Sequence, residues 1–392
     1  MFVIDAFGAR WTLDVSELAP SLGAELLRLW ERARVDGAEP SPTPDDAPAF
    51  VVRRTVEGRV EIDGVPHLLV DADLPYAVSR ALTAASIHRR SGECLMLHAA
   101  GVATDDGGTV ALVAGSGTGK TTASRVLGQS LGYVTDETVC VEHDLRVLAY
   151  PKPLSVVVDP EAPRGKRESS PDELGLVRAP AALTLSCTVL LRRSPDVTSP
   201  VLEPISLVDA MAEVLPQTSA LPSLDRPLDR LAVALTTGHG PWRLTYRDVA
   251  DCVDLVADLA HRRFPDGPPH EVTWTWVHGH EGPAADEVDQ PEAAPHDPAD
   301  VAPDAATTWT RAPFRDAVVS DGSALVMLDR VPVTLPGLAA TVWLAAGDPV
   351  RLADLVHAAT ASHGPHPDAE GVVTGTVATL VAQGLLRTGA RA

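Results

Sequence analysis

The stretch that decides the fold prediction reads Ala114-Gly115-Ser116-Gly117-Thr118-Gly119-Lys120-Thr121-Thr122. The apolar run 110–113 precedes it and the helix-compatible run 123–127 follows it. This pattern predicts a strand, a glycine-rich loop and a helix. Backbone N–H groups in such a loop converge on one point, and the helix directs the positive end of its dipole at the same point. We therefore expect phosphate to bind there.

The loop follows the phosphate-loop pattern G-x-x-x-x-G-K-[ST] at every position except the first, where Ala114 replaces glycine. We expect the neighbouring Gly115 to supply the positive-φ freedom that glycine alone has without strain. In this pattern the lysine reaches the terminal phosphates and the hydroxyl that follows it binds Mg²⁺. A glycine-rich turn without a ligand is the alternative. The predicted nucleotide-binding residues are Gly115, Ser116, Gly117, Thr118, Gly119, Lys120, Thr121 and Thr122.

Composition narrows the class of protein. The chain has 392 residues, 45% of them hydrophobic, which is enough for two or three domains with real cores. Its net charge of −21 argues against a nucleic-acid partner. No apolar run approaches the about 18 residues of a membrane span, so we expect a cytoplasmic protein with no membrane partner. The cysteines are far apart and predict small core residues rather than a zinc cluster or a disulfide framework: Cys94, Cys140, Cys187 and Cys252.

Two further features flank the loop. His98 interrupts the apolar strand predicted over 94–103, and composition alone favours a hydrogen-bonded core histidine there. Asp136 and Glu137 follow Lys120 by only 16 and 17 positions and are expected on the next strand. Side chains alternate between the faces of a regular strand, so at most one of the two carboxylates needs to face a nucleotide unless the strand ends there. A solvated acidic strand end is the alternative.

The segments 97–102, 115–122 and 132–137 together resemble the HPr serine kinase-like family, including its relatives in lasso-peptide and other peptide-modification pathways. The order of histidine, phosphate loop and acidic pair is typical of that family and of the distantly similar phosphoenolpyruvate carboxykinases. The resemblance implies ATP and Mg²⁺ as cofactors and places His98 beside the transferred phosphate. It implies that Asp136 and Glu137 bind metal and accept the proton of a substrate serine. The family usually has two aspartates, so Glu137 leaves open which carboxylate is the base. The implied catalytic residues are His98, Lys120, Asp136 and Glu137, and the implied metal ligands are Thr121, Asp136 and Glu137.

Other candidates follow in the chain. Lys152, between two prolines, is either a ligand of substrate or phosphate or a solvated loop lysine. Arg192, Arg243 and Arg247 are weaker candidates, because surface pairing is the commoner fate of an arginine. The pattern over 229–264 predicts helix apart from a break at 238–241.

The C-terminal part changes character. Residues 281–304 carry eight acidic and no basic side chains, which predicts a disordered linker. Strands are then predicted over 317–319 and 324–328, and helices over 335–345, 350–362 and 368–383. This order resembles the PqqD-like family of small winged-helix domains, which hold precursor peptides for modifying enzymes. The matching features are a strand pair ending at Leu328-Asp329, the helix 339–343 and the terminal Gly384-Leu385-Leu386. A DNA-binding winged helix is the alternative, and the acidic chain counts against it.

The predicted fold class is α/β, with four regions: 1–72, an N-terminal α+β extension; 73–264, the HPr kinase-like P-loop domain; 265–312, an acidic Pro/Ala-rich linker; and 313–392, the PqqD-like winged-helix domain. The predicted function is a phosphotransferase that phosphorylates a hydroxyl, with serine favoured, of a ribosomally synthesised precursor peptide held by the C-terminal domain. Such a protein would act in RiPP biosynthesis beside other peptide-modifying enzymes. A nucleotide-binding scaffold that delivers the peptide without phosphorylating it is the first alternative, and a small-molecule kinase is the second. The oligomeric state stays open.

Overall fold

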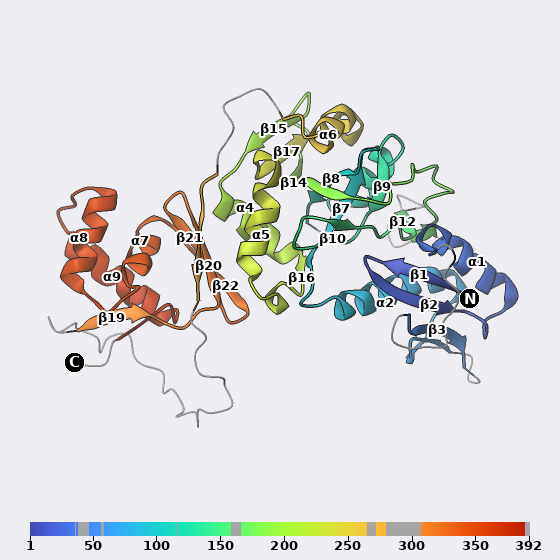
Figure 1. The fold of residues 1–392 in the computed structure, drawn as a ribbon, viewed down its shortest axis with the longest axis horizontal. Coiled ribbons are helices and arrows are strands. Elements are labelled where there is room, and N and C mark those ends of the chain that lie inside the picture. Colours follow the sequence, from blue (N-terminus) through green and yellow to red (C-terminus); the bar gives the residue numbers. More distant parts are fainter. Residues whose placement is uncertain are drawn as a thin grey trace. The chain divides into compact units, whose positions relative to one another are not determined.

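The computed structural model describes residues 1–35, 37, 47–55, 59–115, 117–157, 166–264, 272–279 and 307–388. The chain divides into two compact units, each of mixed α/β structure with its own core. The first comprises Met1–Ile205, Glu213–Asp225 and Val233–His270, and the second comprises Ser206–Ala212, Arg226–Ala232 and Glu271–Ala392 (Figure 1). Within the described parts of the chain, no helix combines the length and apolar character that a membrane span requires.

The first unit is built around a six-stranded sheet with the order β15-β17-β14-β8-β7-β9. The central strand β8 pairs in parallel with β14 and antiparallel with β7, and α3 packs against β7 while α6 packs against β8. The predicted strand, loop and helix are therefore confirmed as β8, the loop 114–119 and α3. The bounds of these elements are β7 (Ala99–Ala103), β8 (Gly108–Val113), α3 (Lys120–Leu127), β9 (Gly132–Thr135), β14 (Thr184–Arg193), β15 (Val201–Pro204), β17 (Trp242–Tyr246) and α6 (Val253–Ala260).

A second sheet, with the order β11-β10-β6-β16, lies in the same unit. The strand predicted over 94–103 is in fact two strands, because the chain passes from this sheet to the six-stranded one at His98. The return passage lies between β9 and β10, where the acidic pair is found. The bounds are β6 (Leu95–Leu97), β10 (Val139–Val141), β11 (Val147–Leu148) and β16 (Thr218–Ser219), and β12 (Leu154–Val157) pairs separately with β13 (Lys166–Ser169).

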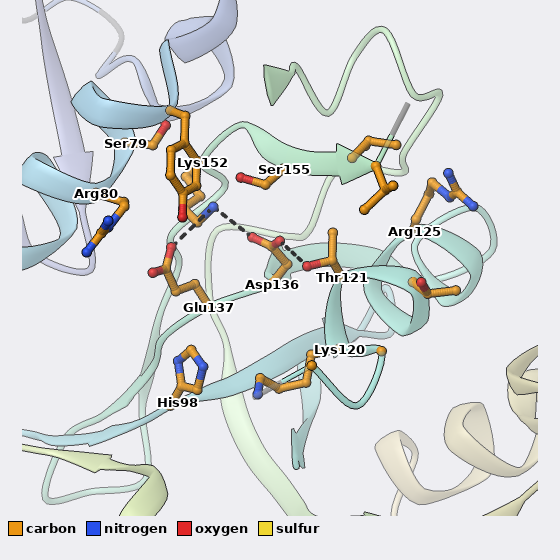
Figure 2. A pocket seen from close by; sticks show the side chains of 16 residues that line it. Ser79, Arg80, His98, Lys120, Thr121, Arg125, Asp136, Glu137, Lys152 and Ser155 are labelled. Carbon is orange, nitrogen blue, oxygen red and sulfur yellow. Dashed lines mark hydrogen bonds and ion pairs between the residues drawn. The ribbon is translucent and has the colours of Figure 1, made fainter. Parts of the chain in front are cut away.

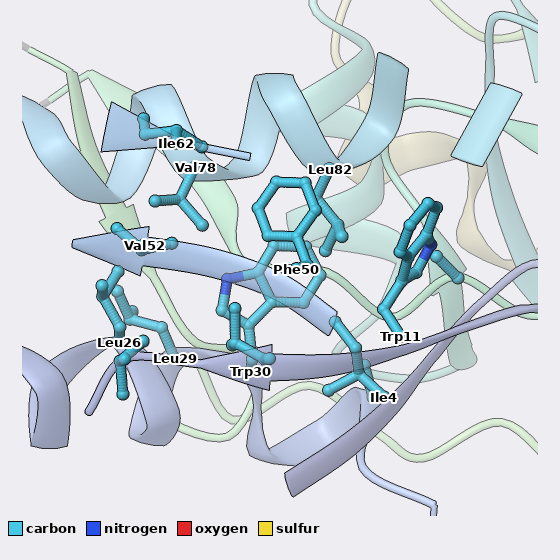
Figure 3. Close-up of a cluster of buried hydrophobic side chains, with 14 of the residues drawn as sticks. Ile4, Trp11, Leu26, Leu29, Trp30, Phe50, Val52, Ile62, Val78 and Leu82 are labelled. Atoms are coloured by element: carbon cyan, nitrogen blue, oxygen red, sulfur yellow. The ribbon is translucent and has the colours of Figure 1, made fainter. Parts of the chain in front are cut away.

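The N-terminal residues add a sheet with the order β1-β2-β3-β4-β5. Trp30 and Phe50 are fully buried in a cluster between this sheet and two helices (Figure 3). The same cluster contains Met96 and Cys140, so the N-terminal region shares its core with the second sheet. The bounds are β1 (Phe2–Ala6), β2 (Ala9–Asp14), α1 (Pro20–Trp30), β3 (Ala49–Arg54), β4 (Val60–Ile62), β5 (Val65–His67) and α2 (Leu74–Arg89).

Two further predictions in this unit were wrong. Cys94 and Cys140 form a disulfide, whereas Cys187 and Cys252 are free and buried as expected. The antiparallel pairing of β6 with β10 brings the Cα atoms of the disulfide to 6.3 Å, a proximity that 46 residues of separation conceal in the sequence. The helix predicted across 242–246 is the strand β17, whose buried residues alternate with half-buried ones.

The second unit holds two sheets, with the orders β18-β20-β21-β22 and β23-β19-β24, and three helices that pack on one another. The strands and helices predicted over 317–383 are confirmed. Strands β18 and β19 lie inside the range 265–312 that was predicted as linker, and residues 281–304 lie outside the described residues. The bounds are β18 (Thr275–His278), β19 (Thr308–Arg311), β20 (Asp316–Ser320), β21 (Ser323–Leu328), β22 (Val331–Leu335), α7 (Gly337–Ala345), β23 (Val350–Arg351), α8 (Leu352–His363), α9 (Ala369–Ala382) and β24 (Leu386–Thr388), and the remaining helices are α4 (Leu207–Val214) and α5 (Pro227–Thr236).

Trp343 anchors the core of the second unit. It is fully buried, Phe314 meets its ring edge-on at 5.0 Å between centroids, and the Arg311 guanidinium lies 4.4 Å from the ring centroid. We predict that Trp343→Ala costs about 3–5 kcal/mol of stability in this unit, as other large-to-small core changes do. Hydrogen exchange of the full chain should show lost protection over β20 and β21 and unchanged protection around α3. Equal loss in both units would contradict separate cores.

Candidate active site

A pocket of about 630 Å³ opens in the first unit beside the glycine-rich loop (Figure 2). Its walls come from that loop and α3, from α2, from β12 and from the bend between β9 and β10. Of the predicted site residues, it brings together Gly117, Gly119, Lys120, Thr121, Thr122, His98, Asp136 and Glu137.

The loop owes its shape to two glycines. Gly117 has φ of +78° and Gly119 has φ of +97°, in the left-handed region that other residues enter only with strain. The expectation that Gly115 supplies this freedom was therefore wrong. The Gly115 carbonyl instead accepts a hydrogen bond from Thr118 Oγ1 at 2.6 Å. The predicted ligand Ser116 lies outside the described residues.

Lys120 folds back over the loop. Its Nζ donates to the Ala114 carbonyl at 2.6 Å and to the Gly115 carbonyl at 3.1 Å. Burial lowers the pKa of Lys120, while the charges of Asp136 and Glu137 oppose that shift. Alanine at position 114, where the pattern has glycine, therefore does not prevent the loop carbonyls from binding the Lys120 ammonium.

The acidic pair lies just past the end of a strand, not on it as predicted. Strand β9 ends at Thr135, whose Oγ1 accepts hydrogen bonds from the backbone N–H groups of Glu137 (3.2 Å) and Thr138 (3.3 Å). This turn breaks the alternation of side chains, so that both carboxylates line the same pocket. Asp136 Oδ2 accepts a hydrogen bond from Thr121 Oγ1 at 3.0 Å.

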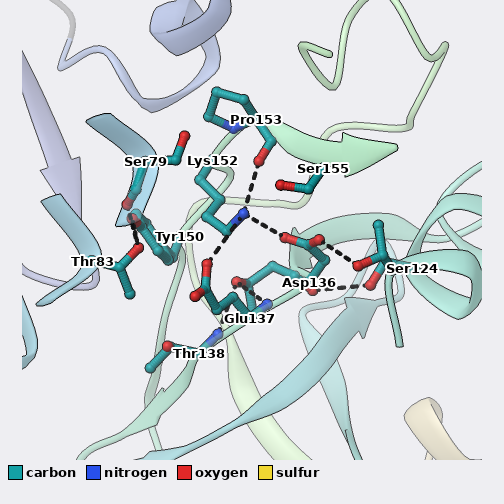
Figure 4. A network of polar contacts seen from close by, with 12 residues as sticks. Ser79, Thr83, Ser124, Asp136, Glu137, Thr138, Tyr150, Lys152, Pro153 and Ser155 are labelled. Carbon is teal, nitrogen blue, oxygen red and sulfur yellow. Dashed lines mark hydrogen bonds and ion pairs between the residues drawn. The ribbon is translucent and has the colours of Figure 1, made fainter. Parts of the chain in front are cut away.

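Lys152 lies behind the acidic pair, with 4% of its side chain exposed (Figure 4). Its Nζ is 3.1 Å from Asp136 Oδ1 and 3.2 Å from Glu137 Oε2. Burial alone would lower the pKa of Lys152, but the two carboxylates and Glu168 outweigh burial and raise its pKa well above the ordinary value. The alternative of a solvated loop lysine is therefore wrong.

Glu168 is buried behind Lys152, where it connects α2 to the β12–β13 hairpin. Its carboxylate accepts hydrogen bonds from Ser79 Oγ at 3.1 Å and from Ser155 Oγ. Burial raises the pKa of Glu168, and the charge of Lys152 opposes that rise. These contacts tie two walls of the pocket together.

His98 lines the pocket on the same side as Lys120 (Figure 2). Burial and the charge of Lys120 lower the pKa of His98 below its ordinary value of 6.5, against the opposing pull of Glu137 and Asp136. The imidazole is therefore mainly neutral at neutral pH.

Sequence reasoning missed several pocket residues. Arg125 follows Thr121 by four positions, a spacing that places both on one face of α3 and that could have found it. Ser79 and Arg80 come from α2, far away in the sequence, and nothing local marks them. The weaker arginine candidates do not line this pocket, within the described residues; Arg243 pairs with Glu213 and Arg247 donates to the Pro195 carbonyl.

Comparison with known proteins adds little to this geometry. No protein-family model and no curated protein matches the sequence. Among solved structures, the HPr(Ser) kinase/phosphatase from Coxiella burnetii is similar at 11% identity and a TM-score of 0.24, with 42% of this chain and 93% of that chain covered. A TM-score this low carries no assignment, so the interpretation of the site rests on its own residues.

We predict that Lys120→Met weakens ATP binding at least tenfold, because Lys120 is the sole lysine of the loop and its ammonium can neutralise the terminal phosphates. Titration with a fluorescent ATP analogue measures the loss. Arg193→Met is the matched control, since it removes a cation whose Nε bonds the Arg247 carbonyl instead. Unchanged affinity in Lys120→Met would show that the nucleotide binds elsewhere.

Proposed function

We propose that the protein is an ATP- and Mg²⁺-dependent phosphotransferase that phosphorylates a hydroxyl, with serine favoured, of a ribosomally synthesised precursor peptide. The observation that carries this proposal is the meeting of two groups in one pocket. The glycine-rich loop contributes Lys120 and Thr121, and the bend after β9 contributes two carboxylates, with Thr121 hydrogen-bonded to Asp136. Phosphoryl transfer needs positioning and charge neutralisation more than covalent chemistry, and these groups offer both.

The residues present fit Mg²⁺. Thr121 Oγ1 and Asp136 Oδ2 lie 3.0 Å apart, and hydroxyl and carboxylate oxygens are the hard ligands that Mg²⁺ prefers. These two side chains would hold the ion, which supplies neutralisation of phosphate charge when bound. Asp136 is thus the carboxylate on the nucleotide side of the pocket.

Glu137 is then the general base. The side chain of Glu137 is 30% exposed, against 4% for that of Asp136. Glu137 lies on the α2 side of Asp136, away from α3 (Figure 2). In the proposed step the acceptor oxygen forms a bond to the γ-phosphorus, and the bond from that phosphorus to the β,γ-bridging oxygen breaks. The hydroxyl proton passes to Glu137, and ADP leaves. The neutral imidazole of His98 and the ammonium of Lys120 line the position of transfer.

Paired variants test this division of roles. Glu137→Gln should lower kcat by about 10²-fold or more while leaving Mg·ATP affinity within about threefold, because a general base contributes roughly 10²–10⁴ to the rate. Asp136→Asn should instead raise the Mg²⁺ concentration needed for half-maximal rate by about tenfold or more, since it removes a metal-binding oxygen. The opposite pattern would exchange the two roles.

The peptide enters the proposal through the second unit. Its strands and helices over 317–383 have the order predicted from the sequence, and the resemblance to the PqqD-like family was based on that predicted order. A peptide held by one part of a chain is presented to the rest of that chain at an effective concentration of up to about millimolar. The second unit would hold the leader of the precursor while the hydroxyl to be modified reaches the first unit.

We predict that a precursor peptide incubated with the full chain, ATP and Mg²⁺ gains one phosphoryl group in mass spectrometry. A peptide that lacks the leader should show a KM at least about tenfold higher with kcat nearly unchanged, because only the tethering is lost. Equal KM values for the two peptides would remove the holding role of the second unit.

The same assay distinguishes the proposed kinase from a nucleotide-binding scaffold that only delivers the peptide. The departures from the family pattern at Ala114 and Glu137 favour that alternative. In that case nucleotide and precursor both bind, but no phosphoryl group reaches the peptide.

A further inference from the structure

Lys152 is deeply buried in the wall of the pocket, with 4% of its side chain exposed, the same fraction as for Asp136. Its Nζ has three acceptors: Asp136 Oδ1 at 3.1 Å, Glu137 Oε2 at 3.2 Å and the Pro153 carbonyl at 2.9 Å (Figure 4). An ammonium has three N–H donors, and these three contacts account for all of them. A phosphate could be bound by Lys152 only if one of the contacts were given up. Lys120, by contrast, donates to two loop carbonyls.

The contacts of Lys152 fix the directions of both carboxylates. On Asp136, Oδ1 is held by Lys152 and by Tyr133 OH (3.3 Å), while Oδ2 is held by Thr121. The carboxylate therefore cannot rotate without breaking contacts at both oxygens. On Glu137, Lys152 holds Oε2 and leaves the side chain partly exposed in the pocket. The ammonium also offsets the repulsion between two adjacent like charges.

Lys152 is itself held in place. The prolines on either side have restricted φ, and the Lys152 backbone N–H donates to the Tyr150 carbonyl at 2.8 Å. Tyr133 OH lies 3.2 Å from the Lys152 carbonyl and shares its one proton between this oxygen and Asp136 Oδ1. The ammonium is thus presented from a fixed backbone.

We infer that Lys152 is a positioning residue for phosphoryl transfer, one that holds Asp136 toward Thr121 and Glu137 toward the acceptor and that does not bind phosphate. This inference rests on the proposed function. It assigns to Lys152 a role that the sequence did not suggest and excludes the phosphate-binding role that the sequence left open.

Two variants test it against a matched control. Lys152→Met removes the charge at similar length and should lower kcat by about 10²-fold or more, since it frees the base whose placement contributes roughly 10²–10⁴. Lys152→Arg keeps the positive charge beside the two carboxylates and is the second test if the methionine variant fails to fold. The planar guanidinium of arginine cannot meet three acceptors that converge on one nitrogen, and kcat should fall at least about tenfold.

In both variants the affinity for ATP, measured without metal, should stay within about threefold of wild type, whereas Lys120→Met should lose at least about tenfold. Tyr150→Phe, which removes the Thr83 contact in the same buried layer and leaves the three Lys152 contacts, should keep kcat near wild type.

The outcomes are distinct. An ATP affinity that falls in Lys152→Met as far as in Lys120→Met would make Lys152 a phosphate ligand and overturn the inference. Wild-type kcat in Lys152→Arg would overturn it as well, because the converging geometry would then be dispensable. A kcat loss in Tyr150→Phe equal to that in Lys152→Arg would show a general effect of disturbing this layer. Absence of transfer by the wild-type chain would instead overturn the proposed function, and the ATP-affinity comparison would still decide whether Lys152 binds phosphate.

Discussion

One backbone hydrogen bond joins the two places where the chain changes sheets. Ala99 N donates to the Glu137 carbonyl at 3.1 Å, directly after His98 on one passage and at the acidic pair on the other. Residues in the middle of a sheet point to alternate faces, but residues between two sheets are released from that rule. The pocket depends on this freedom of side-chain direction at the two passages between the sheets. Without it, Asp136 and Glu137 would face opposite ways and His98 would be one more core residue of a continuous strand.

The sequence was most informative where the chemistry is local. The glycine-rich loop and α3 could be predicted because positive φ, helix formation and phosphate geometry are all encoded within nine residues. The acidic pair could be found by its distance from Lys120, whereas the direction of its side chains could not, because the turn at Thr135 is a property of the assembled sheets. The burial of Lys152 was equally out of reach, since it arises from α2, β9 and the hairpin of β12 and β13 meeting around it. Strand β17 is different, because its alternation of buried residues was present in the sequence and was outweighed by helical signals on either side.

The buried charges of the first unit form a layered arrangement. Asp136 and Glu137 face the pocket, Lys152 lies behind them, and Glu168 contributes a further negative charge that two serine hydroxyls satisfy. Such a network is costly when any member lacks a partner and rigid when all are paired. The N-terminal region takes part in this rigidity, because α2 supplies Ser79 and Thr83 and packs in the core shared with the N-terminal sheet. The N-terminal sheet therefore supports the site through α2, and none of the described residues before α2 lines the pocket.

The pocket gathers Arg80, Lys120 and Arg125 in a chain whose net charge is −21. An anion approaching from solution meets repulsion first and attraction only within about one Debye length, which is roughly 8 Å at physiological ionic strength. Salt should weaken the distant repulsion more than the attraction inside a partly enclosed site. Association of the proposed nucleotide would then be unusually tolerant of ionic strength, in contrast to enzymes that attract anions with a positive surface.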